Sequence, residues 1–407
     1  MRDGPTGLLT GIRVLELGNF VAAPFACRLF ADFGADVIKI ERPGAGDEVR
    51  HWRMTRGSTS MMFRTLARNK RSVTIDLNSP SGRDLVLELV AQADVVVENF
   101  RPGTLERWGL GPEALQERNP DVVLVRISGY GQTGPRKDEA GFGSAAEAFG
   151  GLRYITGSPD GEPVRPAASM ADTVAGLYGV IGALMLLLRK ARGPSLGDSP
   201  HVVDVALYEA VFSLLESLVP DYDAYGIVRE RSGGRLPGVV PTGDYPCLDG
   251  KSVIIGGNAN GVFRRLMQAI GRDDLAVDPR LQDGDGRARH EEEIEGAITT
   301  WTSSQDVNSA LKVLADARVP SAPVYDAAQI ARDEHYLARG MVRRATVSID
   351  DEPEEIRFPG VVPVLPGQEG QLRWVGPELG AHTDEVLHEV LGADQARIQS
   401  LREAGVI

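Results

Sequence analysis

Cysteine, histidine and lysine are all scarce in this chain of 407 residues, and each scarcity excludes a kind of chemistry. The two cysteines, Cys27 and Cys247, lie far apart and outside any paired-cysteine motif, which excludes a disulfide framework and a cysteine-rich zinc site. The six histidines form no HxH or HExxH cluster, so we predict that no metal is bound. Unpaired cysteines suit a reducing compartment, and we expect a cytoplasmic protein.

An excess of positive charge and long hydrophobic runs are also missing. The net charge of −13 opposes nonspecific binding to nucleic acid or to an anionic membrane. The uncharged run 173–188 contains three glycines and is shorter than the roughly 20 apolar residues of a membrane span. The first residues, MRDGPTGLLTGIRVLEL, carry an acid and a proline where a signal peptide needs a basic region and an apolar core. We therefore predict neither a nucleic-acid partner nor a membrane partner.

One segment is basic although the whole chain is acidic. Between Lys39 and Asp76 there are nine basic residues and four acidic ones, a local balance of +5 (9 − 4). A solvated face is the simpler interpretation, but a cationic segment in so acidic a chain favours a small polyanionic ligand. Because the chain has only six lysines, we expect arginine, whose planar fork binds phosphate bidentately, to recognise that ligand.

The first 131 residues alternate short β-branched runs with helical patterns. This alternation predicts βαβ units and a largely parallel sheet that is covered on both faces, which is a doubly wound, Rossmann-like α/β domain. Ligands of such sheets bind beyond the carboxyl ends of the strands. The expected strands are 13–17, 36–41, 72–77, 94–100 and 121–128, and two of the expected helices are 25–34 and 80–93.

A loop rich in Gly, Pro and Arg at 229–243 predicts a domain boundary or a mobile flap. Beyond it, a hairpin turning at Asp249 and Gly250, followed by helices, predicts a smaller α+β domain. We expect the chain to return to the large domain and to end in a helix capped by Thr383. The expected division is a large domain over 1–225, a small domain over 226–326 and a return segment over 327–407.

Asp172 stands at the start of an apolar helix, where an N-cap is its simplest role on local evidence. Large apolar residues recur on one side of the helix and small residues on the other, which predicts a helix buried on all sides. The large residues are Val174, Leu177, Tyr178, Ile181, Leu184, Met185 and Leu188, and the small ones are Ala175, Gly176, Gly179, Gly182 and Ala183.

Two common enzyme classes do not fit the motifs. The turn after the first expected strand reads ELGNFVAAPFACR, with one glycine where the dinucleotide fingerprint GxGxxG needs three. No GxSxG elbow is present, which argues against a serine hydrolase.

Six motifs together resemble the class III CoA-transferases, the family of formyl-CoA transferase and α-methylacyl-CoA racemase. They are GIRVLELGNFVAAPFACRLFADFGADVIKIERPG, NKRSVTIDL, ADVVVENFRPGTLERWGL, ISGYGQTGP, ASMADTVAG and GAHTDEVL, in the family's order and over nearly the whole chain. The family's nucleophilic aspartate falls on Asp172. The resemblance therefore implies that Asp172 attacks a thioester to give a mixed anhydride and then an aspartyl-CoA thioester, and it implies an interlocked homodimer.

For CoA, a cosubstrate rather than a permanently bound cofactor, the resemblance implies a site on the N-terminal loops. Arg42 and Arg107 match the family's basic positions, whereas surface ion pairs are the expected role of Arg50 and Arg53. A lysine of formyl-CoA transferase falls near Ala140, so the phosphate site is not identical. The other implied CoA-binding residues are Asn19, Phe20, Val21, Ala22, Ile75, Asn99 and Phe100.

The segment SGGRLPG resembles the glycine-rich loop that closes over the family's active site. Gly233 and Gly234 would bring bare backbone N–H groups to an anhydride oxyanion, and a plain flexible linker is the alternative.

The choice between transferase and racemase depends on a second acid/base group. Phe142 stands at the position of the racemases' histidine, and Asn260 stands near their glutamate. Because phenylalanine cannot move a proton, a CoA-transferase is predicted, with an α-methylacyl-CoA racemase or epimerase and a noncatalytic acyl-CoA-binding protein as alternatives. The segment VVPTGDYPCLDG favours succinyl-CoA and another dicarboxylic acid. Arg165 and Arg235 are candidates to hold a second carboxylate, and surface ion pairs are the simpler role for each.

Overall fold

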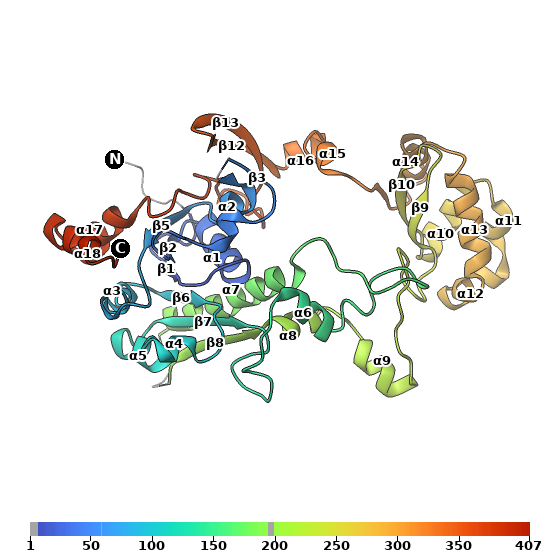
Figure 1. Ribbon diagram of the computed structural model, residues 1–407. Coiled ribbons are helices and arrows are strands. Elements are labelled where there is room, and N and C mark those ends of the chain that lie inside the picture. The colour runs from blue at the N-terminus through green and yellow to red at the C-terminus, as the bar shows by residue number, and fades with distance from the viewer. Residues whose placement is uncertain (1–6, 58, 194–198) are drawn as a thin grey trace. The chain divides into compact units, whose positions relative to one another are not determined.

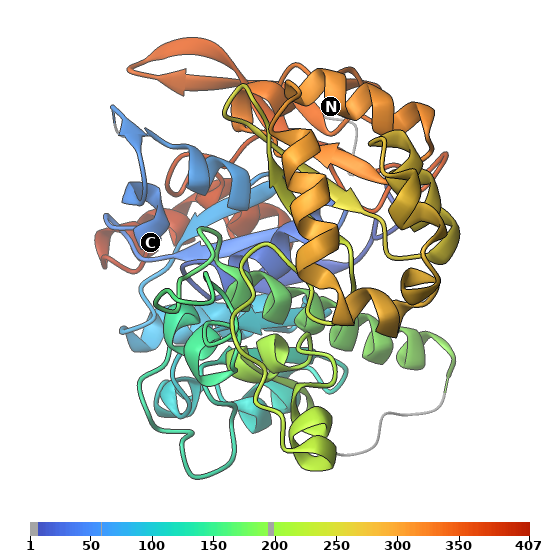
Figure 2. The same cartoon turned by 90° about the vertical axis from the view of Figure 1, so that its right-hand side faces the viewer.

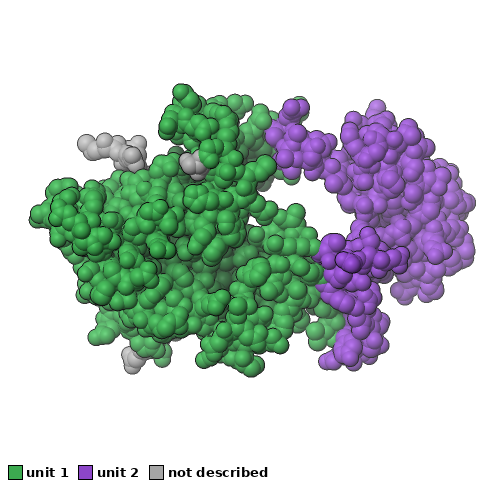
Figure 3. Space-filling model, in the orientation of Figure 1, with its two compact units in different colours: residues 1–153, 165–220, 334–407 green, residues 154–164, 221–333 purple. Residues whose placement is uncertain are grey.

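The computed structural model describes residues 7–57, 59–193 and 199–407, which form two compact units (Figure 3). Unit 1 contains residues 1–153, 165–220 and 334–407. Unit 2 contains residues 154–164 and 221–333.

Unit 1 is built on a six-stranded parallel sheet with the strand order β5-β2-β1-β6-β7-β8 (Figure 1). Counted along the chain within this sheet, the order is 3-2-1-4-5-6, as in doubly wound folds. The order reverses between β1 and β6, so the loops after these two strands meet at the switch point where such sheets bind ligands. The strands are β1 (Arg13–Glu16), β2 (Asp36–Glu41), β5 (Lys70–Thr74), β6 (Val95–Glu98), β7 (Val123–Ser128) and β8 (His201–Ala206).

Helices cover both faces of this sheet, as the uniformly apolar strands predict. Successive residues of a strand point to opposite faces, so Val14 lies in one core cluster and Leu15 in the other. The first cluster includes residues of α1 (Ala22–Asp32), α6 (Gly143–Phe149), α7 (Met170–Ala191) and α8 (Leu207–Phe212). The second includes residues of α3 (Pro80–Val90), α4 (Thr104–Arg107), α5 (Pro112–Arg118), α17 (Thr383–Leu391) and α18 (Gln395–Glu403).

The remaining regular elements of unit 1 lie outside the six-stranded sheet and the helices named above. They are a 3-10 turn (Glu48–His51), β3 (Thr55–Arg56), β4 (Thr59–Ser60), α2 (Met61–Leu66), α16 (Glu334–Ala338) and the antiparallel pair of β12 (Val342–Ile349) and β13 (Glu352–Pro359); α9 (Leu218–Tyr225) spans the boundary between the units.

Helix α7 was predicted to be buried on all sides, but only one side of it is buried. Its small residues face inward because close approach demands them: a Cβ on Gly176 would lie 2.9 Å from Phe25, and one on Gly182 would lie 2.5 Å from Val203. The large apolar residues face outward, and Met185 is 65% exposed and Leu188 54% exposed. The prediction of burial on all sides is therefore wrong for the single chain.

Helix α7 is also longer than its uncharged run. With 22 residues it is, among the described residues, the one helix with the length and composition to cross a membrane, although its small face packs in the core. A single core helix of this kind is weak evidence for a membrane span.

Two other expectations are wrong in detail. Strand β8 was not predicted, because it lies at the edge of the sheet and has alternating rather than continuous burial. Helix α17 begins at Thr383 with His382 as its N-cap, so Thr383 is not the cap. Instead its Oγ1 accepts a hydrogen bond from the Thr74 backbone N–H, 3.1 Å away, which fixes α17 beside β5.

Unit 2 has a three-stranded antiparallel sheet with helices packed against it (Figure 2). The predicted hairpin turns at Gly250, where a φ of +74° favours glycine. The strands are β9 (Thr242–Pro246), β10 (Ser252–Gly256) and β11 (Ser321–Pro323). The helices are α10 (Asn260–Ala269), α11 (Asp273–Val277), a 3-10 turn (Pro279–Leu281), α12 (Gly284–Arg289), α13 (Glu291–Thr302), α14 (Val307–Asp316) and α15 (Ala327–Ile330).

Candidate active site

Asp172 is the third residue of α7 and half-buried. The helix begins at Met170 with Ser169 as its N-cap, and the capping role considered for Asp172 is therefore wrong. An acidic side chain in the first turn is still favoured by the helix dipole. The absence of a capping role removes the simplest structural reason for a carboxylate at this position.

Helix α6 approaches the Asp172 carboxylate so closely that a side chain at Gly143 would collide with it. A Cβ on Gly143, the first residue of α6, would lie 2.2 Å from Asp172 Oδ2. Its neighbour Phe142, at the position of the racemases' histidine, is the N-cap of α6 and is 69% exposed. A glycine backbone therefore lies where a side chain would displace the carboxylate.

A fully buried glutamate lies on the same helix. Glu147 is 0% exposed, and its Oε2 accepts a hydrogen bond from Arg165 Nε at 3.1 Å. Arg153 Nη2 lies 3.8 Å from the same oxygen and donates to Ser144 Oγ at 2.8 Å. Within the described part of the chain, no group hydrogen-bonds to Glu147 Oε1. The glutamate's negative charge is thus matched on one oxygen only.

These surroundings raise the pKa of Asp172 to about 6. Burial of the carboxylate is the main cause, the charge of Glu147 adds to it, and the charge of Arg165 opposes it. The helix N-terminus favours the ionised carboxylate, but burial outweighs that effect. The carboxylate form still predominates at neutral pH, and a nucleophile needs that form.

The loop after β1 and the loop after β6 are tied together at the switch point. Asn19 N–H donates to Asn99 Oδ1 at 2.9 Å, and Asn99 Nδ2 donates to the Asn19 carbonyl at 2.8 Å. A Cβ on Gly18 would lie 2.4 Å from Asn99 Oδ1, so glycine is required for this approach. The sequence-predicted CoA-binding residues Asn19 and Asn99 are therefore in direct contact.

Phe20 is held in this loop from the opposite side. Its N–H donates to Asp47 Oδ1 at 3.1 Å, and its φ of +64° is unusual for a residue with a side chain. Phe20 is 39% exposed, and its ring lies against that of Trp52 with ring centroids 5.2 Å apart. An exposed aromatic pair thus stands at the carboxyl end of the sheet.

The other predicted CoA-binding residues differ in exposure. Arg42 and Arg107 are exposed. Arg42 directly follows β2, and Arg107 is the last residue of α4, the short helix after β6. Arg107 donates to Thr104 Oγ1 at 2.9 Å, whereas no side chain of the described residues pairs with Arg42. Val21, Ala22 and Ile75 are buried, and Phe100 is half-buried with its ring against Trp108.

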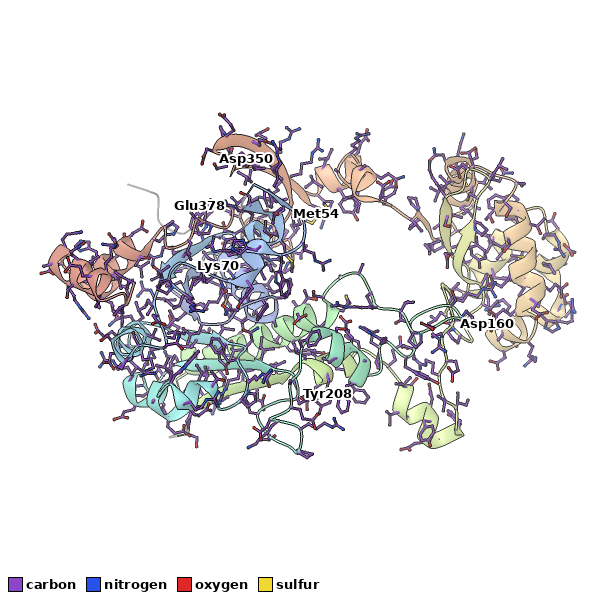
Figure 4. All side chains as sticks on the ribbon, viewed as in Figure 1. Met54, Lys70, Asp160, Tyr208, Asp350 and Glu378 are labelled. Carbon is purple, nitrogen blue, oxygen red and sulfur yellow. The ribbon has the colours of Figure 1, made fainter. Side chains whose placement is uncertain are left out.

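The basic segment 39–76 is mostly neutralised inside unit 1, which corrects the interpretation that it forms a cationic site. Seven of its nine basic residues form ion pairs with acids, and among the described contacts only Arg42 and Arg53 have none. Lys70, which is labelled in Figure 4, lies in β5. It is buried with Lys39 around Glu16. Arg50, expected at the surface, is instead buried and pairs with Glu41 at 2.7 Å. The paired residues are Lys39, Arg50, Arg56, Arg64, Arg68, Lys70 and Arg71.

The predicted glycine loop lies in unit 2. Gly233 has a φ of +64° and is exposed, and a Cβ on Gly234 would lie 1.2 Å from Asp244 Oδ1. The next residue, Arg235, lies 3.4 Å from Glu291 Oε1 and 3.7 Å from Glu295 Oε2. Crowding by the Asp244 side chain therefore explains Gly234, and Arg235 joins the loop to α13.

Glu147 and Asp47 are site residues that the sequence reasoning missed. Glu147 is the single charged residue in the thirteen-residue stretch AGFGSAAEAFGGL, and a lone acid among small and apolar residues was the available signal. Asp47 gave no such signal, because it lies among other charged residues. No group of three His, Cys, Asp or Glu residues able to hold a metal ion is found among the described residues.

Comparison with known proteins agrees with the resemblance seen in the motifs. Residues 9–383 match CoA-transferase family III. The chain is 42% identical over 405 residues to succinyl-CoA–D-citramalate CoA-transferase of Chloroflexus aurantiacus, covering 99% of each chain. It is 41% identical to the β subunit of succinyl-CoA–L-malate CoA-transferase of the same organism, covering 100% of each. The crystal structure of a CAIB/BAIF family protein from Brucella suis superposes with a TM-score of 0.80 at 30% identity, covering 94% of this chain and 99% of that one. The chain therefore belongs to CoA-transferase family III and is a CoA-transferase.

Proposed function

We propose that the protein transfers CoA from succinyl-CoA to a second small dicarboxylic acid, with Asp172 as the nucleophile. The observation that carries this proposal is the Asp172 carboxylate itself, which is half-buried beside Gly143 and without a capping role. The printed names of the two Chloroflexus relatives, which pair succinyl-CoA with D-citramalate or L-malate, support the substrate class.

The transfer proceeds in four balanced steps. An Asp172 oxygen attacks the thioester carbonyl carbon, and the C–S bond breaks. CoA departs as the thiolate, and a mixed anhydride of Asp172 and succinate is formed. The thiolate then attacks the Asp172 acyl carbon, which releases succinate and leaves an aspartyl-CoA thioester. The acceptor carboxylate attacks this thioester and expels the thiolate again, giving a second anhydride. The thiolate finally attacks the acceptor's acyl carbon, which yields the new acyl-CoA and frees Asp172.

We assign CoA to the switch point of the large sheet. The loop of Asn19 and Phe20 is braced there by Asn99 and Asp47, so the aromatic face of Phe20 is presented without a loop rearrangement. Arg42, an exposed cation free of any side-chain pairing with the described residues, and Arg107 then bind phosphate.

The outward face of α7 is the proposed interface of a homodimer. Six large apolar residues of this face are 38% to 65% exposed, which is costly for a lone chain in water; they are Leu177, Tyr178, Ile181, Leu184, Met185 and Leu188. An interlocked homodimer, with a second copy covering this face, removes that exposure. The division into 1–225, 226–326 and 327–407, a lid role for Gly233 and Gly234, and a cytoplasmic location are part of the same proposal.

Trapping the covalent intermediate tests the function. The protein incubated with succinyl-CoA and no acceptor should accumulate an adduct that hydroxylamine converts to a hydroxamate, with the mass change in the peptide PAASMADTVAGLYG. Asp172→Ala should abolish both the adduct and the transfer while keeping CoA affinity.

Solvent deuterium gives the contrasting result. Deuterium entering the α-position of a branched acyl-CoA, with no adduct at Asp172, would contradict the transferase mechanism and favour a racemase. A folded Asp172→Ala variant that retains turnover would remove Asp172 from the nucleophile role.

A further inference from the structure

Arg165 is anchored at one end and open at the other. Its Nε donates to Glu147 Oε2 at 3.1 Å, and its side chain is 42% exposed. In the described parts of the chain, no hydrogen bond engages its two terminal nitrogens. Because the guanidinium is planar, fixing Nε orients both terminal N–H groups in one plane. This is the geometry that binds a carboxylate through two parallel hydrogen bonds.

Arg165 also acts electrostatically on the proposed nucleophile. Its charge is the one cationic influence that lowers the raised pKa of Asp172. Glu147, on α6, and Gly143, which touches Asp172, belong to the same short helix. Helix α6 therefore contacts Arg165 through Glu147 and Asp172 through Gly143, which places the guanidinium and the reacting carboxylate beside the same helix.

A dicarboxylic acyl group brings an electrostatic problem to this site. One end reacts at Asp172, and the other end is a second carboxylate that enters the field of Asp172 and Glu147. Two nearby negative charges repel a third unless a cation compensates it. Arg153 is less suited to this task, because its Nη2 already bonds Ser144 Oγ and its side chain is 29% exposed.

We propose that Arg165, positioned by Glu147, binds the distal carboxylate of the dicarboxylic donor and acceptor and so selects diacids over monoacids. The proposal rests on the proposed function and names the residue that sets its substrate class. Glu147 acts as a positioning residue, because its buried charge fixes Nε and leaves the fork of Arg165 for the substrate. Glu147 engages Arg165 through Oε2 alone, and no group of the described residues hydrogen-bonds to its other oxygen.

The test compares succinyl-CoA with its uncharged methyl ester, which has nearly the same shape. The readout is the ratio of their rate constants for forming the hydroxylamine-sensitive adduct, which requires a single attack. Arg165→Met should lower this ratio at least tenfold, mainly because adduct formation from succinyl-CoA becomes slower. Arg165→Lys, which keeps the charge but loses the fork, should lower it less. Glu147→Gln should also lower the ratio, because the fork is no longer held.

Arg153→Met is the matched control, since it removes the other arginine beside Glu147. It should leave the ratio within about threefold of the wild-type value. An unchanged ratio in Arg165→Met, or an equal fall in Arg153→Met, overturns the proposal.

Binding measurements keep the test independent of turnover. Titration calorimetry with succinate and with monomethyl succinate should show the same loss of preference in Arg165→Met, and thermal unfolding checks that each variant is folded. A wild-type protein that forms no adduct at Asp172 contradicts the proposed function. An adduct with an unchanged succinate preference in Arg165→Met contradicts this inference alone.

Discussion

Two glutamates in unit 1 are completely buried, and their charges are matched in opposite ways. Each oxygen of Glu16 has its own lysine, with Lys39 at 2.8 Å from one oxygen and Lys70 at 2.6 Å from the other. Glu147 has one oxygen on Arg165, with Arg153 farther away, and its other oxygen has no hydrogen bond among the described residues.

The difference separates a structural charge cluster from a reactive one. Around Glu16, the ion pairs join β1, β2 and β5, so the charges hold neighbouring strands in place. Around Glu147, the incompletely matched charge contributes to the raised pKa of Asp172. We therefore interpret the incompletely matched charge of Glu147 as part of the reactive site and the matched cluster around Glu16 as part of the sheet's structure.

Glu16→Gln should have the largest effect on stability. Removing this charge leaves two buried lysines short of a partner, and breaking such a buried cluster costs about 3 to 5 kcal/mol. Glu147→Gln should change the free energy of unfolding by less than about 1 kcal/mol, because both of its arginines reach solvent. Urea unfolding at neutral pH measures both values, and similar losses in the two variants would refute the distinction.

Arg42 extends the comparison to the cations of the basic segment. Unlike Lys39 and Lys70, it is exposed and pairs with no side chain of the described residues, so Arg42→Ala should leave stability unchanged. The same change, and Arg107→Ala, should weaken CoA binding by about 1.5 to 3 kcal/mol each, or roughly tenfold or more. A greater loss for CoA than for dephospho-CoA identifies contact with the 3′-phosphate. Full CoA affinity in both variants would contradict the assignment of these arginines.

Asp172→Asn should stabilise the protein while abolishing transfer. The folded-state pKa of about 6 lies above the ordinary value of 3.8, so the folded state binds the proton more tightly than the unfolded state. The stability of the wild type therefore falls as pH rises from about 4 to 6. The stability of the variant does not fall for this reason, because asparagine does not ionise. The expected gain is about 1 to 2 kcal/mol at pH 8, vanishing below about pH 4. Thermal unfolding across this range measures it, and a gain that is equal at both pH values would indicate a cause other than ionisation.

Much of the fold could be predicted because parallel strands buried on both faces read as continuous apolar runs. Strands β2 and β7 are of this kind and were located within two residues. Strand β8 was missed because an edge strand is not uniformly buried, and its Val202 is 36% exposed. The burial of α7 was misjudged because periodicity distinguishes two faces without saying which one packs inward, and here close approach selects the small residues.

The site was only partly predictable, for a different reason. Asn19 and Asn99 were found through motifs, and the sheet order brings them together. The basic segment misled because local charge counts ignore distant partners: Arg68 pairs with Asp32, and Lys70 with Glu16. Glu147 was missed because its importance comes from burial and from the contacts of α6 with Asp172 and Arg165.

The acidic side of the pH–rate profile for adduct formation at Asp172 tests the central claim most directly. The rate of adduct formation from succinyl-CoA should be measured against pH in the wild type and in Glu147→Gln, under conditions where one attack is observed. We predict a wild-type rate that falls below about pH 6, as Asp172 becomes protonated, and a fall displaced to lower pH in Glu147→Gln, because the repelling charge is gone. A fall that stays in place or moves to higher pH in Glu147→Gln would contradict the claim that the buried glutamate tunes the nucleophile.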